Sequence, residues 1–196
     1  PAALLTVILQ NTLRLMLPET EDLEALLRRL NGVLHTYNAS GSFVTMILCR
    51  WSPGGESVEV ANAGHPAPLW LRRDGTIQSF PTHVGVALGI EPSWTGTIQL
   101  CDARDVDAAV AFTDGASEAR CPAGTEYGVD RLAHTLARLG SQPADRIVAE
   151  LAQGVRSYCA PAEPADDVTF LVVTRTPTSQ LSACGAEAGA SPPRAP

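Results

Sequence analysis

The chain has 196 residues and a formal net charge of −7, and 45% of its residues are apolar. This length and apolar content are typical of one globular domain with a sizeable core, which excludes a disordered or fibrous protein. The acidic balance and the lack of a lysine or arginine cluster argue against a nucleic-acid-binding surface. No run of about 18 apolar residues occurs, so the sequence predicts no membrane span.

The five cysteines indicate reduced thiols in a cytoplasmic protein. Their number is odd, and no two of them have the spacing of a zinc knuckle or a redox pair. The apolar N-terminal residues lack a basic leader, so no signal peptide is predicted.

Two helices are predicted at the start of the chain. Apolar residues recur at helical spacing over residues 2–17 and again over residues 21–37, with Thr20 as the predicted N-cap of the second helix. The apolar faces of these two helices are expected to pack against a sheet.

Strands dominate the middle of the chain. The nearly continuous apolar run at residues 43–50 predicts a central strand. Further strands are predicted by alternation and turn residues, at residues 57–63, 67–72, 76–80, 96–100 and 108–113. The dipeptide Asp74-Gly75 predicts a hairpin between the strands at residues 67–72 and 76–80.

The pattern then returns to helices, at residues 129–139 and 143–158, and ends with a strand at residues 168–174. Helices at both ends of many antiparallel strands indicate an α+β sandwich. Residues from about 177 onward lack apolar periodicity and predict a disordered tail.

Two acidic turns are the candidate functional residues. Asp114 follows the strand at 108–113, and Asp166 and Asp167 precede the strand at 168–174. Carboxylates at the ends of buried strands cost desolvation free energy unless they are paired, hydrogen-bonded or bound to a metal ion. If both strands share a sheet, these oxygen ligands suit Mg²⁺ or Mn²⁺. The alternative is that Asp-Gly is an ordinary turn and Asp-Asp a solvated loop end.

Six motifs occur in an order that identifies a family. They are Phe43-Val44-Thr45-Met46, Ala61-Asn62-Ala63-Gly64-His65-Pro66, Leu88-Gly89-Ile90, Phe112-Thr113-Asp114-Gly115-Ala116-Ser117-Glu118-Ala119, Glu126-Tyr127-Gly128 and Asp166-Asp167-Val168-Thr169. Over residues 1–176 this order resembles the sporulation stage II E-type branch of the metal-dependent protein serine/threonine phosphatases, whose fold is like that of the type 2C enzymes.

The resemblance implies a four-layer αββα sandwich, in which helices flank two antiparallel sheets, and a binuclear Mn²⁺ or Mg²⁺ centre between the sheets. It implies that Asp114 and Asp166 are metal ligands, and that Asp167 shares or replaces the second role. Gly115, Asn62 and His65 flank this expected site. For Asn62 and His65 the favoured interpretation is that they hydrogen-bond their own loop.

The reaction implied by the resemblance is hydrolysis of phosphoserine or phosphothreonine on a partner protein. The implied partner is a phosphorylated regulatory protein of the anti-anti-sigma type, and an upstream sensor domain is a further hypothesis. The oligomeric state stays open, with a homodimer among the candidates.

The chain departs from the family pattern at its start. Family members carry two more acidic motifs upstream, and neither occurs in residues 1–196. One explanation is that the sequence is a fragment of an active phosphatase, and we favour it because Asp114, Asp166 and Asp167 are retained. The second is a degenerate module that binds a regulatory partner without catalysis. A third is an unrelated α+β domain whose acidic turns are structural.

Overall fold

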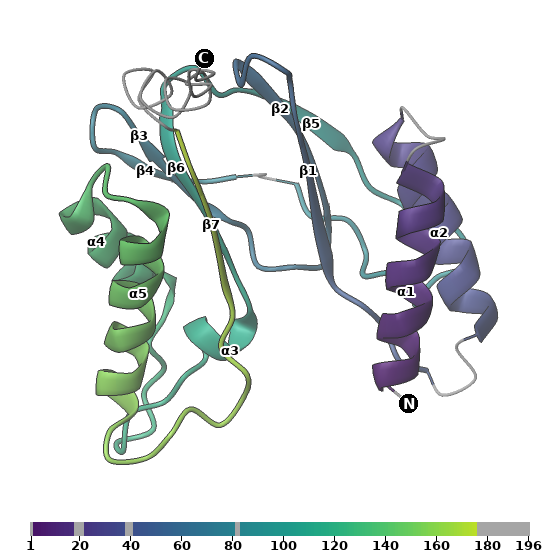
Figure 1. The fold of residues 1–196 in the computed structure, drawn as a ribbon. Coiled ribbons are helices and arrows are strands. Elements are labelled where there is room, and N and C mark those ends of the chain that lie inside the picture. The colour runs from purple at the N-terminus through teal and green to yellow at the C-terminus, as the bar shows by residue number, and fades with distance from the viewer. Residues whose placement is uncertain (1, 18–21, 38–40, 81–82, 176–196) are drawn as a thin grey trace, which may run out of the picture.

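The structure is a computed structural model that describes residues 2–17, 22–37, 41–80 and 83–175. Figure 1 shows four layers: a pair of helices, a first sheet, a second sheet and another pair of helices. Both sheets are antiparallel throughout. The predicted αββα sandwich is therefore confirmed. The tail predicted at residues 177–196 lies outside the described residues.

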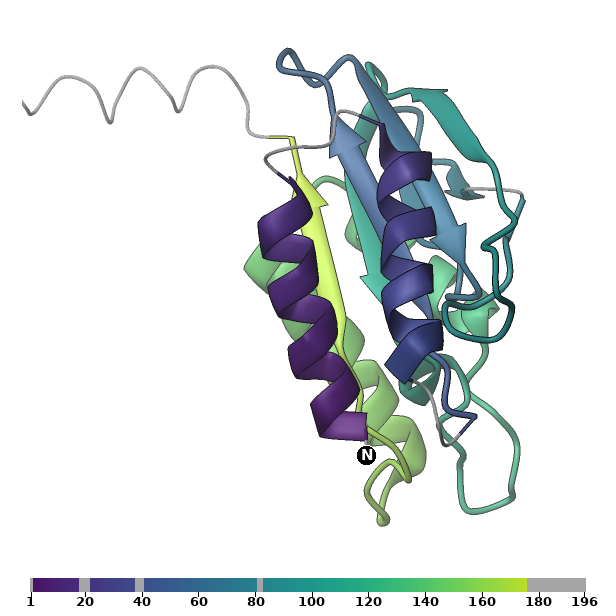
Figure 2. The same ribbon diagram turned by 90° about the vertical axis from the view of Figure 1, so that its right-hand side faces the viewer.

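The first layer consists of α1 (Ala2–Met16) and α2 (Leu23–Tyr37), which lie side by side (Figure 2). Five leucines of α2 are buried against the first sheet: Leu23, Leu26, Leu27, Leu30 and Leu34. The carboxylate of Asp22 accepts a 2.9 Å hydrogen bond from the backbone N–H of Glu24, as an N-cap residue does. The predicted cap Thr20 lies outside the described residues.

The first sheet has the strand order β1-β2-β5, with β1 at Met46–Trp51, β2 at Ser57–Ala63 and β5 at Ile98–Asp102. Among the described residues β1 lies at an edge of its sheet, so the prediction of a central strand at residues 43–50 is wrong. Met46 and Leu48 pack on the helix side of the sheet, whereas Ile47 and Trp51 pack between the sheets. A strand that is covered on both faces gives a continuous apolar run wherever it lies in the sheet.

The second sheet has the order β4-β3-β6-β7, with β3 at Leu69–Arg72, β4 at Ile77–Ser79, β6 at Val106–Phe112 and β7 at Phe170–Thr174. The predicted hairpin turn is confirmed, because Asp74 accepts a 2.9 Å hydrogen bond from Thr76 N–H and Gly75 has a φ of 85°. The antiparallel pairing of Phe112 with Phe170 places the end of β6 beside the start of β7.

The outer face of the second sheet is covered by α4 (Val129–Leu139) and α5 (Ala144–Cys159). Their buried side chains include Leu132, Leu136 and Ile147. A short helix that the sequence did not predict, α3 (Asp114–Ser117), directly follows β6.

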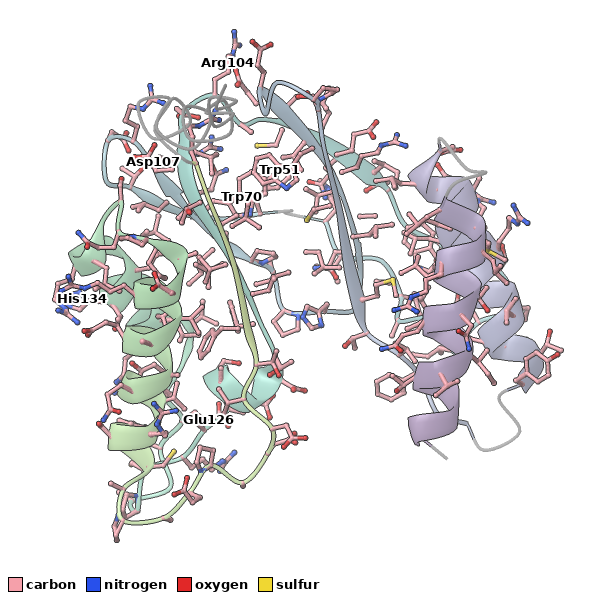
Figure 3. The ribbon with its side chains drawn as sticks, in the orientation of Figure 1. Trp51, Trp70, Arg104, Asp107, Glu126 and His134 are labelled. Atoms are coloured by element: carbon pink, nitrogen blue, oxygen red, sulfur yellow. The ribbon has the colours of Figure 1, made fainter. Side chains whose placement is uncertain are left out.

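Between the sheets, the core contains the aromatic residues Trp51, Trp70 and Phe80. Trp51 from the first sheet stacks on Trp70 from the second, with ring centroids 5.8 Å apart (Figure 3). The edge of Phe80 meets Trp70 at 5.2 Å. This cluster joins the sheets at the end away from the acidic turns.

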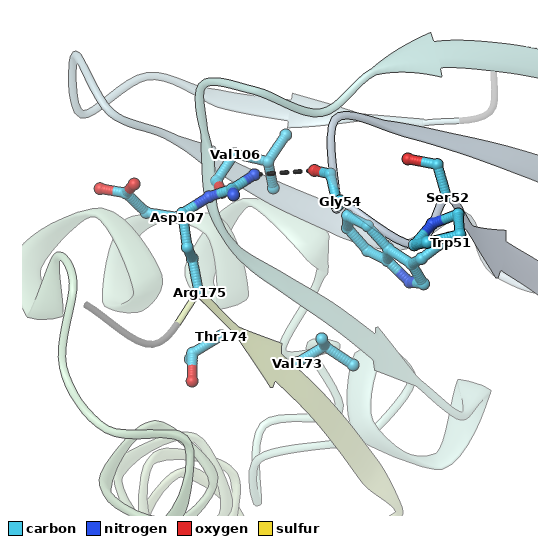
Figure 4. A pocket seen from close by; sticks show the side chains of 10 residues that line it. Trp51, Ser52, Gly54, Val106, Asp107, Val173, Thr174 and Arg175 are labelled. Atoms are coloured by element: carbon cyan, nitrogen blue, oxygen red, sulfur yellow. Dashed lines mark hydrogen bonds between the residues drawn. The ribbon is translucent and has the colours of Figure 1, made fainter. Parts of the chain in front are cut away.

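At the same end, Arg175 connects the β1–β2 turn to the β5–β6 turn, and Figure 4 shows its bond to the first of these. Its guanidinium donates hydrogen bonds to the backbone carbonyls of Gly55 at 2.9 Å, Ala103 at 2.7 Å and Val106 at 3.3 Å. Within the described ranges, no helix combines the length and apolar character needed to cross a membrane.

Candidate functional site

The two acidic turns meet at one end of the second sheet. The hydroxyl of Thr113 donates a 3.0 Å hydrogen bond to the carbonyl of Asp167 and accepts one of 3.0 Å from the N–H of Thr169. The N–H of Thr113 in turn donates to the carbonyl of Thr169 at 3.2 Å. The structure therefore brings the turn of Asp114 beside the turn of Asp166 and Asp167.

Gly115 allows this close approach. A Cβ atom at Gly115 would overlap the carbonyl oxygen of Asp167 and would lie 3.4 Å from the carbonyl carbon of Asp166. Glycine is needed here because of the neighbouring backbone, since its own φ is not in the left-handed region.

The three carboxylates are exposed, which corrects the expectation of costly burial at the ends of buried strands. For Asp166 and Asp167 the reason is that β7 is an edge strand among the described residues, on which Leu171 keeps 66% of its surface exposed. Asp114 lies beyond the end of β6, at the start of α3. Local backbone groups bind two of the carboxylates: Asp114 accepts from Gly115 N–H at 3.0 Å, and Asp166 accepts from Asp167 N–H at 2.7 Å. Desolvation therefore does not force these groups to bind a metal ion.

The donor chemistry at this end of the sheet fits a hard divalent cation, because it consists of carboxylate oxygens on adjoining turns. The set is partial, however. Among the described residues, no group of three His, Cys, Asp or Glu side chains is gathered closely enough to hold a metal ion. A complete site thus needs further oxygen ligands, from water or from protein.

The loop after β2 faces this acidic end from the first sheet. The side-chain amide of Asn62 donates to the carbonyl of His65 at 2.8 Å, and its oxygen accepts from the N–H of His65 at 2.8 Å. Asn62 and His65 thus hydrogen-bond each other within their own loop, as the favoured interpretation of the sequence expects.

The His65 ring extends beyond its loop. Its Nδ1 lies 3.1 Å from the hydroxyl of Thr45, which directly precedes β1. Burial lowers the pKa of His65 below its usual 6.5, although the carboxylate of Asp114 and a backbone hydrogen bond with Phe112 act to raise it. Burial therefore favours the neutral form of His65, and the ring lies within electrostatic reach of Asp114.

An apolar cavity of about 270 Å³ lies between the sheets at this end, next to the acidic turns. Its lining includes Thr45, His65, Phe112, Thr113 and Leu171.

Sequence reasoning did not assign a role to Thr113, Thr169 or Thr45. The first two tie the acidic turns together, and the third binds His65. All three lie within the quoted motifs, but a threonine beside a strand carries no signal of its own, since it is common in strands for steric reasons.

The comparisons with known proteins agree with this architecture. Residues 1–176 match the family described as stage II sporulation protein E (SpoIIE). The RsbU and RsbW domains of Rv1364c from Mycobacterium tuberculosis superimpose with a TM-score of 0.74 at 24% identity, over 90% of this chain and 50% of that chain. The SiaA-PP2C domain of Pseudomonas aeruginosa gives 0.76 at 18% identity, over 90% and 71%.

The phosphatase domain of SpoIIE from Bacillus subtilis is also similar, with a TM-score of 0.56 at 16% identity, over 88% of this chain and 75% of that chain. The chain spans half the length of the Mycobacterium tuberculosis chain that it matches. No curated protein matches the chain. At these identities the solved structures show the fold, which is that of PP2C-type domains. The match over residues 1–176 shows more, namely that the chain belongs to the stage II sporulation protein E family.

Proposed function

We propose that the chain is the catalytic part of a metal-dependent protein serine/threonine phosphatase. The observation that carries this proposal is the meeting of the two acidic turns through Thr113, in a chain that belongs to the SpoIIE family. Solved structures with the same fold are described as serine phosphatases, which supports the same reaction class. The domain proper is proposed to be residues 1–176.

In this proposal Asp114 and Asp166 bind Mn²⁺ or Mg²⁺, and Asp167 shares or replaces the role of Asp166. Bound there, two such ions supply a water of lowered pKa and neutralise the oxygens of the phosphate. Thr113 holds the two turns at a fixed separation, and Gly115 leaves room for their contact. The ligands that complete the set are proposed to lie outside the described residues.

The proposed substrate is a phosphoserine or phosphothreonine on a regulatory protein of the anti-anti-sigma type. The likeness to a chain that contains RsbU and RsbW domains supports a regulatory partner. A cytoplasmic location is part of the proposal and is supported by the free thiols of Cys49, Cys101, Cys121 and Cys159 among the described residues.

The test is hydrolysis of a phosphoserine peptide in the presence of Mn²⁺, Mg²⁺ or a chelator, by the purified chain and by a version extended upstream to carry the two acidic motifs. The proposal expects the activity in the extended version, and the substitutions below are made in it. We expect activity only with metal, and a loss of at least about 100-fold in Asp114→Asn, since metal ions contribute several kcal/mol of transition-state stabilisation. Asp130→Asn is the matched control, because Asp130 is exposed on α4 and outside the acidic turns. Hydrolysis that survives both chelation and Asp114→Asn would contradict the proposal.

A second candidate is a phosphatase-fold module that binds a regulatory partner without catalysis. It is favoured by one observation, that the described residues hold no group of three metal-binding side chains. It predicts no hydrolysis and partner binding that is unchanged by a chelator. The extended version separates the candidates, because only the phosphatase gains activity from the two upstream acidic motifs.

A further inference from the structure

We propose that His65 is a positioning residue that couples the first sheet to the Asp114 turn of the second. The proposal deepens the proposed function, because Asp114 is the metal ligand whose place His65 would fix. It rests on the loop that carries His65, on the partners of its ring and on the cavity beside it.

The loop is built to hold His65 in one place. Asn62 is only 1% exposed, and its amide binds both the N–H and the carbonyl of His65. The intervening Gly64 has a φ of 71°, and a Cβ there would lie 2.9 Å from the Cβ of Ala87. A buried amide whose donor and acceptor are both satisfied fixes the backbone that it binds.

The ring of His65 reaches from one sheet to the other. On the first sheet Nδ1 lies 3.1 Å from the hydroxyl of Thr45, and Phe112 of the second sheet lines the same cavity as the ring. The backbone of Phe112 also acts to raise the pKa of the imidazole. A neutral imidazole has one donor and one acceptor. The proposal gives the donor to the Phe112 carbonyl, which places the N–H on Nε2 and leaves Nδ1 to accept from Thr45. With both nitrogens occupied, His65 is not itself a metal ligand.

The His65 ring lies where it can affect the Asp114 turn. Phe112 lies two residues before Asp114, and the cavity of about 270 Å³ separates the sheets here. A polar contact across a poorly filled space restricts the end of β6 more than the same contact would in a packed core. Removing the ring is therefore expected to loosen the Asp114 turn while the remainder of the fold stays intact.

Amide hydrogen exchange of the whole chain, without added metal, tests this directly. The probes are three hydrogen-bonded amides at the turn, those of Thr113, Ala116 and Glu118. In His65→Ala we expect their exchange to rise about tenfold while amides in α5 keep the wild-type rate, as in local opening. Unchanged protection at the turn, or the same acceleration throughout the chain, would overturn the proposal.

Two further variants keep the test interpretable. Thr45→Val removes the hydroxyl partner and keeps the shape of the side chain, so it should accelerate exchange at the turn by a smaller factor, even if His65→Ala folds poorly. His134→Ala is the matched control, since His134 is exposed on α4 (Figure 3), and it should change neither region. The side-chain nitrogen NMR shifts of His65 should show the N–H on Nε2, and the opposite tautomer would contradict the assignment.

A Mn²⁺ titration of the same proteins separates this proposal from the proposed function. If the wild type binds Mn²⁺, His65→Ala should weaken binding about tenfold at a temperature where both proteins are folded, because a ligand that must first be ordered binds less tightly. If the wild type binds no Mn²⁺, the metal-dependent function fails for this chain, and the exchange data still decide whether His65 positions the turn.

Discussion

Among single residues, Gly115 makes the strongest steric demand at the candidate site. Gly115→Ala would force its new Cβ against the carbonyl of Asp167, so the two acidic turns would have to separate. We expect a loss of about 1–3 kcal/mol in the free energy of unfolding, as is typical of overpacking. Urea denaturation of the variant measures this loss.

Gly32→Ala is the control for this prediction. Gly32 lies within α2, and no atom comes within 4 Å of the place where its Cβ would be. Alanine in the middle of a helix is expected to stabilise the chain by about 0.5–1 kcal/mol. A Gly115→Ala variant as stable as the wild type would show that the turns can move apart without cost.

His65 gives the chain a predictable dependence on pH. Its pKa is lowered in the folded state, so the unfolded chain takes up a proton near pH 6.5 while the folded chain still resists protonation. The contribution to stability is fully present above pH 6.5 and is lost as the pH falls through the lower folded value. Thermal unfolding from pH 7.5 to 5.5 should show a smaller decrease in Tm for His65→Gln than for the wild type.

At this scale the sequence predicts part of the candidate site. The proximity of Asp114 and Asp166 could be predicted, because the turns that carry them border two predicted strands of one sandwich. The exposure of the Asp166 carboxylate could not be predicted, because it depends on the place of β7 at an edge of its sheet. The link through Thr113 was also hidden, because it is made of one hydroxyl between segments more than fifty residues apart.

At the scale of elements, periodicity performs best where one face is buried and the other is solvated. The prediction for α4, whose buried residues are Leu132 and Leu136, coincides with the observed bounds Val129–Leu139. The prediction for β2 also coincides with the observed bounds, Ser57–Ala63, although both faces of this strand are buried. In contrast, the run in β1 is apolar on both faces, so it could not indicate the position of the strand in the sheet. The four residues of α3 are too few to show a helical period.

Arg175 connects elements that are distant in the chain, and its loss has a predictable cost. Arg175→Ala would leave the carbonyls of Gly55 and Ala103 without this donor, between the first hairpin and the last strand. We expect a decrease of about 1–3 kcal/mol in the free energy of unfolding, discounted for the partial exposure of the side chain. Chemical denaturation provides the measurement.

Arg146→Ala is the matched control for Arg175, because Arg146 is an exposed arginine on α5. Its removal should change stability by less than about 0.5 kcal/mol, as for most surface substitutions. Equal effects of the two variants would mean that Arg175 acts only through its charge.

At the scale of the whole molecule, the sandwich is closed unevenly. The end with Trp51, Trp70 and Arg175 is joined by ring stacking and by the three carbonyl hydrogen bonds. The end with the acidic turns has the cavity of about 270 Å³ and the ring of His65, and the other end has a cavity of about 310 Å³ lined by both sheets. The two ends therefore differ in the contacts that join the sheets.

The edge strands β1 and β7 have a consequence for how the protein behaves at high concentration. Within the described residues each pairs on one side only, and on β7 the side chains of Leu171 and Val173 are 66% and 45% exposed. Such edges are templates for sheet extension between molecules. The net charge of −7 keeps copies apart at low ionic strength, but salt screens this repulsion, with a Debye length that falls from about 30 Å at 0.01 M to about 8 Å at 0.15 M. Light scattering should therefore rise with added salt, and kinetic assays of this chain belong at micromolar protein and low salt.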